Sequence, residues 1–157
     1  MQYSAEELGQ ALMDALENTL LKRARSPKVA LAVATKGTEI IKRRTAQGLD
    51  KQGATFAALS PKYRDWKAKK GRQPIANLAF TGHMLNDIYA KVEGDHAVIA
   101  FTSQRVPASS DKADGHIKGS GNLPVRDFFG IDDRPADVSE LQRVAEDAIK
   151  KVLGGVA

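Results

Sequence analysis

The chain has 157 residues and no cysteine, and 42% of its residues are hydrophobic and 27% charged. This length fits a single domain, residues 1–157, that can bury enough surface to fold without covalent cross-links. The lack of cysteine excludes disulfides, thiolate nucleophiles and cysteine-based zinc sites. No apolar run approaches the roughly 20 residues of a membrane helix, and the acidic N-terminus lacks an export-signal core. We therefore expect no membrane partner, and a protein of the cytoplasm or of an assembly built there.

The net charge of +5 is unevenly distributed along the chain. Residues 1–20 include four acidic and no basic residues, and residues 21–75 include fifteen basic and three acidic ones. Residues 76–157 include nine basic and twelve acidic residues. A basic middle segment is compatible with binding to nucleic acid, with binding to an acidic partner surface, or with simple exposure to solvent. Exposure to solvent is the simplest interpretation, because Lys and Arg are common on exposed helical faces. An acidic block beside a basic one also suits head-to-tail contact between copies of one protein.

Two helices are predicted in the first third of the chain. A capping box at 4–7 precedes leucines at positions 8, 12, 16 and 20, a spacing typical of an amphipathic helix. Ser26 and Pro27 have the pattern of an N-cap and a first helical residue, and they begin a second helix that runs to about Gly48. Gly37 weakens this helix by about 1 kcal/mol relative to alanine. Its outer face is expected to carry Lys36, Lys42, Arg43 and Arg44.

A short helix is predicted between Ser60 and Gly71, because Ser60 is followed by proline and glycine ends such elements. Tyr63 and Trp66 lie three residues apart and share a face of this helix. We interpret the pair as an anchor on the core. The alternative is an aromatic and basic patch that contacts bases or a partner.

The second half predicts strands and a final helix. Apolar runs at 88–92 and 97–101 flank a Gly-Asp turn and predict a hairpin. Residues 102–122 have no periodicity and predict a flexible loop. The apolar segment 124–130 predicts an edge strand because it contains Pro124. A last helix begins near Asp137 or Ser139 and ends at Gly154.

These elements predict an α+β fold. The expected sheet is small and mostly antiparallel, and it is built from the 88–101 hairpin and the 124–130 segment. The N-terminal helices and the C-terminal helix should pack on this sheet.

Motifs for catalysis or metal binding are not found in the sequence. The three histidines lie in different segments, and no nucleophile elbow, phosphate-binding loop or dinucleotide fingerprint occurs. We expect no catalytic residue, no metal, no cofactor and no enzymatic activity. The alternative of an undetected enzyme requires a pocket that gathers His83 or His116 with carboxylates.

Three stretches occur in a characteristic order. They are GATFAALSPKY at 53–63 running on to KAKKG at 67–71, LAFTGHMLNDI at 78–88, and PVRDFFGI at 124–131. The order resembles the phage virion-morphogenesis, or tail-completion, family of tailed phages. In that family an L-S-P-x-Y and K-x-K-x-G stretch precedes L-x-x-T-G-x-L, a hairpin, a loop, P-x-R-x-F-x-G and a C-terminal helix. The resemblance covers residues 50–153. Asp127 and Phe129 depart from it, since the family more often has proline and leucine there.

The resemblance implies a structural virion protein of the phage neck or tail. Such a protein forms a ring at the head-proximal end of the tail tube and enables tail completion and head–tail joining. Its implied partners are further copies of itself, the tail tube protein and neck or connector proteins, with non-specific contact to passing DNA. The alternative function is a small basic nucleic-acid-binding module that uses residues 62–72 with Trp66.

Two groups of candidate site residues follow from the resemblance and the charge pattern. The candidate subunit or partner interface consists of Arg126, Phe128, Phe129, Tyr63 and Trp66. The candidate DNA-lumen or partner loop consists of Arg105, Lys112, His116 and Lys118.

Overall fold

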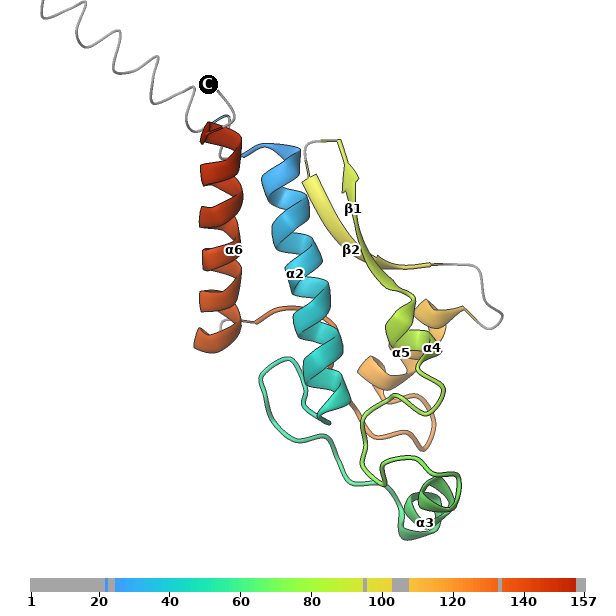
Figure 1. Ribbon diagram of the computed structural model, residues 1–157. Coiled ribbons are helices and arrows are strands. Elements are labelled where there is room, and N and C mark those ends of the chain that lie inside the picture. The colour runs from blue at the N-terminus through green and yellow to red at the C-terminus, as the bar shows by residue number, and fades with distance from the viewer. Residues whose placement is uncertain (1–21, 23–24, 95, 103–107, 133, 155–157) are drawn as a thin grey trace, which may run out of the picture.

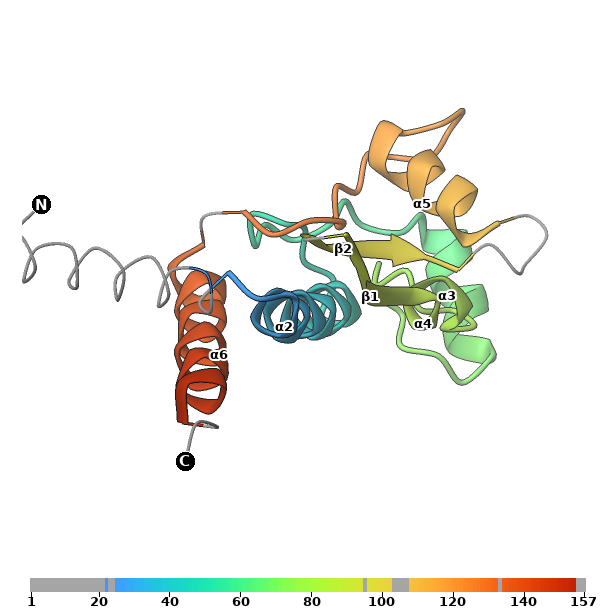
Figure 2. The same ribbon diagram turned by 90° about the horizontal axis from the view of Figure 1, so that it is seen from above.

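The computed structural model of the chain describes residues 22, 25–94, 96–102, 108–132 and 134–154. Helix α2 (Pro27–Ala46) lies in the middle of three layers (Figure 1). It packs on one side against a hairpin of β1 (Ile88–Glu93) and β2 (His96–Phe101), and on the other against α6 (Pro135–Gly154). Figure 2 shows α6 and the hairpin on opposite sides of α2. The predicted α+β class is confirmed.

The limits of α2 follow from its terminal residues. The Ser26 hydroxyl accepts a hydrogen bond from the Val29 amide at 3.4 Å, and Pro27 occupies the first turn. The chain leaves the helix through Gly48, whose φ of 80° is the left-handed conformation that glycine tolerates best. The prediction for this helix is confirmed. The helix predicted to begin at 4–7 lies outside the described residues.

The hairpin matches its prediction. The strands are antiparallel, with Ile88 opposite Phe101 and Glu93 opposite His96. Gly94 has a φ of 63°, as the first position of a tight two-residue turn requires.

The prediction that the 124–130 segment joins the sheet is wrong, because the sheet in the described part of the chain has two strands, β1 and β2. The backbone of this segment bonds elsewhere. The Arg126 amide donates to the His116 carbonyl at 2.8 Å, and the Phe128 amide donates to the Arg126 carbonyl at 2.9 Å. Pro124 has no amide proton to offer to a strand. The segment therefore runs through the core as irregular chain.

The core lies between α2, the hairpin and this irregular segment. Gly37 of α2 faces β2, and a Cβ atom there would lie 3.0 Å from Ile99 Cδ1. The glycine that costs helix propensity thus lets α2 approach the hairpin closely. The buried apolar cluster consists of Ile41, Phe56, Met84, Leu85, Ile88, Ala113 and Phe128.

The loop predicted at 102–122 contains a helix, α5 (Ser109–Lys118), so the prediction is wrong for this part. Residues 103–107 lie outside the described residues. Helix α5 is held by tertiary contacts: the buried Ser109 hydroxyl donates to Asp87 Oδ2 at 2.5 Å, and Ala113 packs in the core. Gly119 ends the helix with a φ of 72°. Helix α5 also packs on the short helix α4 (His83–Asn86).

The expectation that Arg44 lies on the outer face of α2 is wrong, because its side chain is 2% exposed. Its guanidinium donates to Asp137 Oδ2 of α6 at 3.0 Å, to the Phe128 carbonyl at 3.0 Å and to the Gly130 carbonyl at 2.7 Å. The neighbouring Arg43 is exposed, as expected, and pairs with Glu140. One basic residue thus joins α2, α6 and the irregular segment.

Candidate functional site

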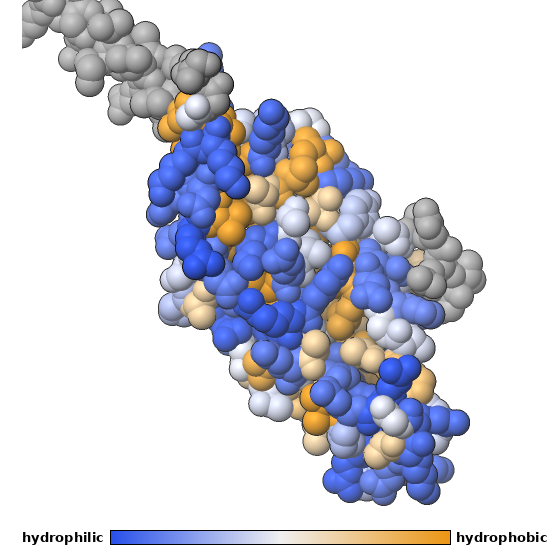
Figure 3. Space-filling model, viewed as in Figure 1, coloured by the Kyte–Doolittle hydropathy of each residue, from blue (hydrophilic) through white to orange (hydrophobic). Residues whose placement is uncertain are grey.

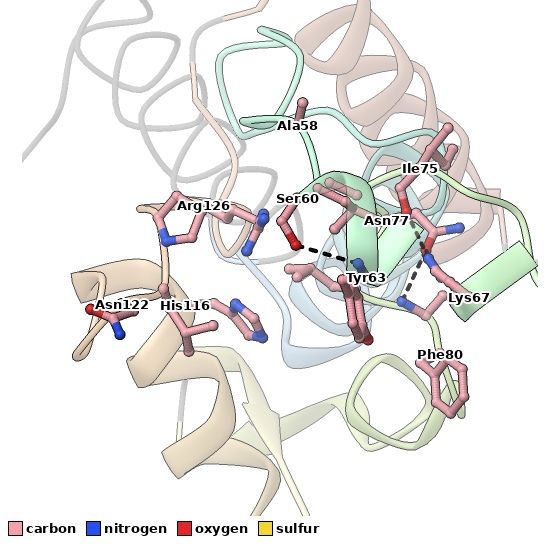
Figure 4. A pocket seen from close by; sticks show the side chains of 16 residues that line it. Ala58, Ser60, Tyr63, Lys67, Ile75, Asn77, Phe80, His116, Asn122 and Arg126 are labelled. Carbon is pink, nitrogen blue, oxygen red and sulfur yellow. Dashed lines mark hydrogen bonds between the residues drawn. The ribbon is translucent and has the colours of Figure 1, made fainter. Parts of the chain in front are cut away.

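A pocket of about 500 Å³ lies between α3 (Pro61–Lys69), the segment 75–80, the end of α5 and the segment 122–126 (Figure 4). We call it the basic pocket. Its walls are largely apolar, with Leu59, Leu78 and Leu123 among the lining side chains. The polar side chains that line it belong to Ser60, Tyr63, Lys67, Asn77, His116, Asn122 and Arg126.

Helix α3 places two of these groups. The Ser60 hydroxyl accepts a hydrogen bond from the Tyr63 amide at 3.4 Å and so begins the helix. Tyr63 and Lys67 are four residues apart and therefore share a face. Lys67 is 3% exposed, and its Nζ donates to the Ile75 carbonyl and to Asn77 Oδ1, each at 2.7 Å. Burial lowers the pKa of Lys67, and repulsion from Arg126 lowers it further.

The opposite wall carries Arg126 and His116 (Figure 4). Arg126 is 5% exposed, its Nη2 donates to the Ala57 carbonyl over a long 3.4 Å, and its buried Nε has no hydrogen-bond partner. The buried Nδ1 of His116 also has no partner. Burial lowers the pKa of His116, and the Arg126 charge adds to this effect. The two residues are linked by the hydrogen bond between their backbones.

The backbone beside the pocket is strained at one point. Leu78 has a φ of 51°, and it is the one non-glycine residue in the described part of the chain with a positive φ. Such a conformation costs about 1–2 kcal/mol in an L-residue, and strain of this kind gathers at functional sites. The strain therefore lies in the wall of the basic pocket.

A stack of three aromatic rings adjoins the pocket. The Tyr63 and Trp66 ring centroids are 5.4 Å apart, and those of Trp66 and Phe80 are 4.9 Å apart. Tyr63 and Trp66 are each 42% exposed. The interpretation of the pair as a core anchor is wrong, because both side chains are exposed and neither belongs to the buried core cluster. We call these three residues the aromatic stack.

The structure separates the candidate interface residues. Arg126 and Tyr63 meet in the basic pocket, and Trp66 lies beside it in the aromatic stack. Phe128 is fully buried in the core, so it cannot form part of a surface interface. Phe129 is half-buried, with its ring centroid 4.9 Å from that of Phe101.

The candidate loop residues are separated as well. His116 lies in the basic pocket, whereas Lys112 and Lys118 are exposed on α5. Lys118 pairs with Asp114 at 2.6 Å within that helix. Arg105 lies outside the described residues.

Sequence reasoning missed Lys67 and Asn77 as pocket residues. Lys67 belongs to a lysine-rich stretch, KAKKG, that is typical of a solvated helical face. Asn77 is buried and holds the Lys67 ammonium, but a lone asparagine carries no sequence signal.

The basic pocket offers positive charge and hydrogen-bond donors. No Asp or Glu residue in the described part of the chain lines this pocket. Among the described residues, no three His, Asp or Glu side chains lie close enough together to bind a metal ion. None of the described helices combines the length and the apolar character needed to span a bilayer.

His116 should make folding stability sensitive to mild acid. Its folded-state pKa is lowered from the ordinary 6.5, so the unfolded chain binds the proton first. This contribution to stability is complete above about pH 6.5, and it is lost as the pH falls from there through the lower folded-state pKa. His116→Gln should reduce the loss in urea midpoint between about pH 7.5 and about pH 5.5.

The matched control is His83→Gln, since the His83 side chain is exposed. Equal acid sensitivity of His116→Gln and the wild type would contradict the prediction.

Comparisons of the chain with protein family models, with curated proteins and with solved structures find no match.

Proposed function

We propose that this protein is a structural virion protein of the neck or tail of a tailed phage. It forms a ring at the head-proximal end of the tail tube, contacts the tail tube and neck proteins, and enables tail completion and head–tail joining. The proposal starts from the resemblance of residues 50–153 to the tail-completion family.

The positions of the motif residues support a structural role. Ser60 of the L-S-P stretch begins α3. Gly82 of the T-G stretch has a φ of 75° where α4 begins. Arg126 and Phe128 are buried in the irregular segment. Each motif thus determines how neighbouring elements of the fold are connected. A fold shared by a family of assembly proteins requires such connections.

The observation that carries the proposal is the incompletely covered apolar face of α6. This helix packs on α2 and lies away from the hairpin (Figures 1 and 2). Figure 3 shows apolar side chains that reach the surface along α6 and α2. The half-buried apolar residues of α6, which we call the α6 stripe, are Val138, Leu141, Val144, Ala145, Ala148, Ile149, Val152 and Leu153.

An amphipathic helix normally buries such a stripe, and contiguous exposed apolar surface marks a contact site. A closed ring needs two different, complementary faces on each subunit. The α6 stripe supplies an apolar face, and the basic pocket with the aromatic stack supplies a second face near α3.

Electron microscopy of the chain mixed with tail tubes of its phage tests the proposal. We expect a ring at the head-proximal end of each tube, and tails of abnormal length or without heads when the protein is absent. Intact, infectious particles made without the protein would overturn the proposal.

Variants of the α6 stripe test the apolar face. Ile149→Gln with Val152→Gln should weaken ring assembly about tenfold or more, because each buried aliphatic side chain contributes about 1.5–3 kcal/mol. Sedimentation measures assembly, and circular dichroism verifies that the subunit remains folded. The control is Glu146→Gln with Lys150→Gln on the exposed face of the same helix. Equal assembly of both double variants would contradict the assignment of the face.

The alternative function is a small nucleic-acid-binding module. The aromatic stack has exposed basic neighbours on and after α3, namely Lys62, Arg64, Lys69, Lys70 and Arg72. Exposed rings beside basic groups suit stacking on single-stranded bases. Affinity of the monomer for DNA that falls steeply with salt and is lost in Trp66→Ala would favour this alternative.

A further inference from the structure

The basic pocket holds buried positive charge with no acid among the described residues that line it. Arg126 makes one hydrogen bond there, at 3.4 Å to a neutral carbonyl, and its buried Nε makes none. Lys67 is held by a carbonyl and an amide oxygen, both neutral. A buried cation is costly unless an anion pairs with it. The pocket as described therefore lacks a counter-ion.

Arg44 provides an internal comparison. It is as deeply buried as Arg126 and its Nε likewise has no hydrogen-bond partner, but its terminal nitrogens pair with the carboxylate of Asp137 and donate to two carbonyls. The fold thus supplies an anion for one buried arginine and leaves the other without one. This difference indicates that the anion for Arg126 comes from another molecule or from a part of the chain outside the described residues.

The shape and lining of the pocket restrict the chemical class of that anion. A volume of about 500 Å³ is within the usual range for bound groups of moderate size. Its leucine-rich walls favour an aliphatic body, and Arg126 with Lys67 favours an oxyanion attached to it. A carboxylate side chain flanked by leucines satisfies both requirements better than a phosphate, which has no aliphatic body to place against these walls.

The chain itself contains a segment that combines carboxylate side chains with leucines. Residues 1–20 include the acidic residues Glu6, Glu7, Asp14 and Glu17, no lysine or arginine, and leucines at 8, 12, 16 and 20. Acidic groups are therefore interspersed with leucines over this whole segment. Its charge and its apolar content are both complementary to the basic pocket.

The position of α2 favours a segment from a neighbouring molecule. Residues 1–20 precede α2, whose 20 residues span about 30 Å. The start of α2 and helix α3 lie at opposite ends of the molecule (Figure 1). A segment joined to the start of α2 has to run back along the whole helix to reach its own pocket, whereas the next copy in a ring can present its pocket directly.

We infer that the basic pocket binds a carboxylate of the N-terminal segment, residues 1–20, of a second copy of this chain, with Arg126 as the ion-pair partner. The inference rests on the proposed ring, and it assigns one of the head-to-tail contacts that close such a ring. Lys67 donates its remaining proton to the same carboxylate, and the leucines of the segment pack on the apolar walls.

The test uses the full-length chain and a fluorescent synthetic peptide of residues 1–20. We expect the peptide to bind the wild-type chain and to compete with its self-association. A peptide with Glu6→Gln, Glu7→Gln, Asp14→Asn and Glu17→Gln should bind at least about tenfold more weakly, since charge-assisted pairs to a buried arginine are strong. This arm leaves the pocket unaltered, so it does not depend on whether a pocket variant folds.

Variants on the protein side locate the contact. Arg126→Gln should lose peptide binding, and Arg126→Lys should retain part of it. The same four acid-to-amide changes in the full-length chain should weaken self-association at least about tenfold. The matched control neutralises four exposed acids elsewhere, Glu39, Glu93, Glu146 and Asp147. Equal binding of the acidic and amide peptides, or equal loss of self-association in the control, would overturn the inference.

Three further outcomes separate a carboxylate ligand from a phosphate ligand, and the pocket contact from the proposed ring. If inorganic phosphate or a single-stranded oligonucleotide raises the unfolding temperature through Arg126 and the peptide does not, the pocket is a phosphate site and the inference fails. If the amide variant still forms rings on tail tubes at wild-type concentration, the inference fails and the proposed function stands. If no ring forms on tubes although the peptide binds, the proposed function fails instead.

Discussion

Replacing Arg44 with methionine should lower the free energy of unfolding by about 3–5 kcal/mol, because it removes the closer ion-pair partner of a buried carboxylate and leaves it the longer contact with Arg134 Nη1 at 3.6 Å. Asp137 is 4% exposed at its side chain and receives the Arg44 guanidinium at 3.0 Å. The same change leaves the carbonyls of Phe128 and Gly130 without this donor. Urea unfolding followed by circular dichroism measures the loss.

The adjacent residue is the control. Arg43→Met removes an exposed pair with Glu140 and should cost at most about 1 kcal/mol. The double variant Arg44→Met with Asp137→Leu should recover much of the loss, since buried ion pairs can be replaced by apolar residues at little cost. An Arg44→Met variant as stable as Arg43→Met would show that the buried pair does not hold α2 to α6.

Truncating Phe128 to alanine should cost about 3–5 kcal/mol, the usual loss for a fully buried phenylalanine. Its side chain is 0% exposed and packs with Ile41, Leu85 and Ile88 in the core cluster. The ring also meets Phe129 edge to face at a centroid distance of 6.3 Å. The expected result is a large fall in the urea midpoint at unchanged slope.

Val125→Ala is the matched control in the same irregular segment. Val125 is exposed, so its truncation should change stability by no more than about 0.5 kcal/mol. A Phe128→Ala variant that unfolds at the wild-type midpoint would contradict this prediction.

The elements with local signals were predictable. Ser26 and Ser60, each followed by proline, mark the starts of α2 and α3. The Gly-Asp pair marks the hairpin turn, and the apolar spacing after Pro135 marks α6. Caps, turn residues and apolar periodicity act within a few residues, so they can be recognised without knowledge of the fold.

The elements that depend on distant contacts were not predictable. Helix α5 has no apolar period and a glycine at position 115, and its first residue is held by Asp87, which lies 22 residues earlier in the chain. Segment 124–130 is apolar enough for a strand, but its amides find partners in α5 and within the segment itself. Apolar composition alone does not say which backbone groups will pair.

The candidate site was predictable only in part. Tyr63 and Arg126 were marked by the resemblance, but their meeting in one pocket depends on how α3 and the irregular segment pack. The sequence predicts that the side chains of both Arg44 and Lys67 are exposed to solvent. A basic residue on a helix gives no local sign that a carboxylate or an amide lies within its reach. Their burial is a property of the tertiary structure.

The three hydrogen bonds of Arg44 also have a mechanical consequence. Any tilt of α6 pulls on Asp137, and the guanidinium passes that displacement to the carbonyl of Phe128, two residues beyond Arg126. The Arg44 side chain thereby couples the position of the last helix to the irregular segment, which carries Arg126 into the wall of the basic pocket.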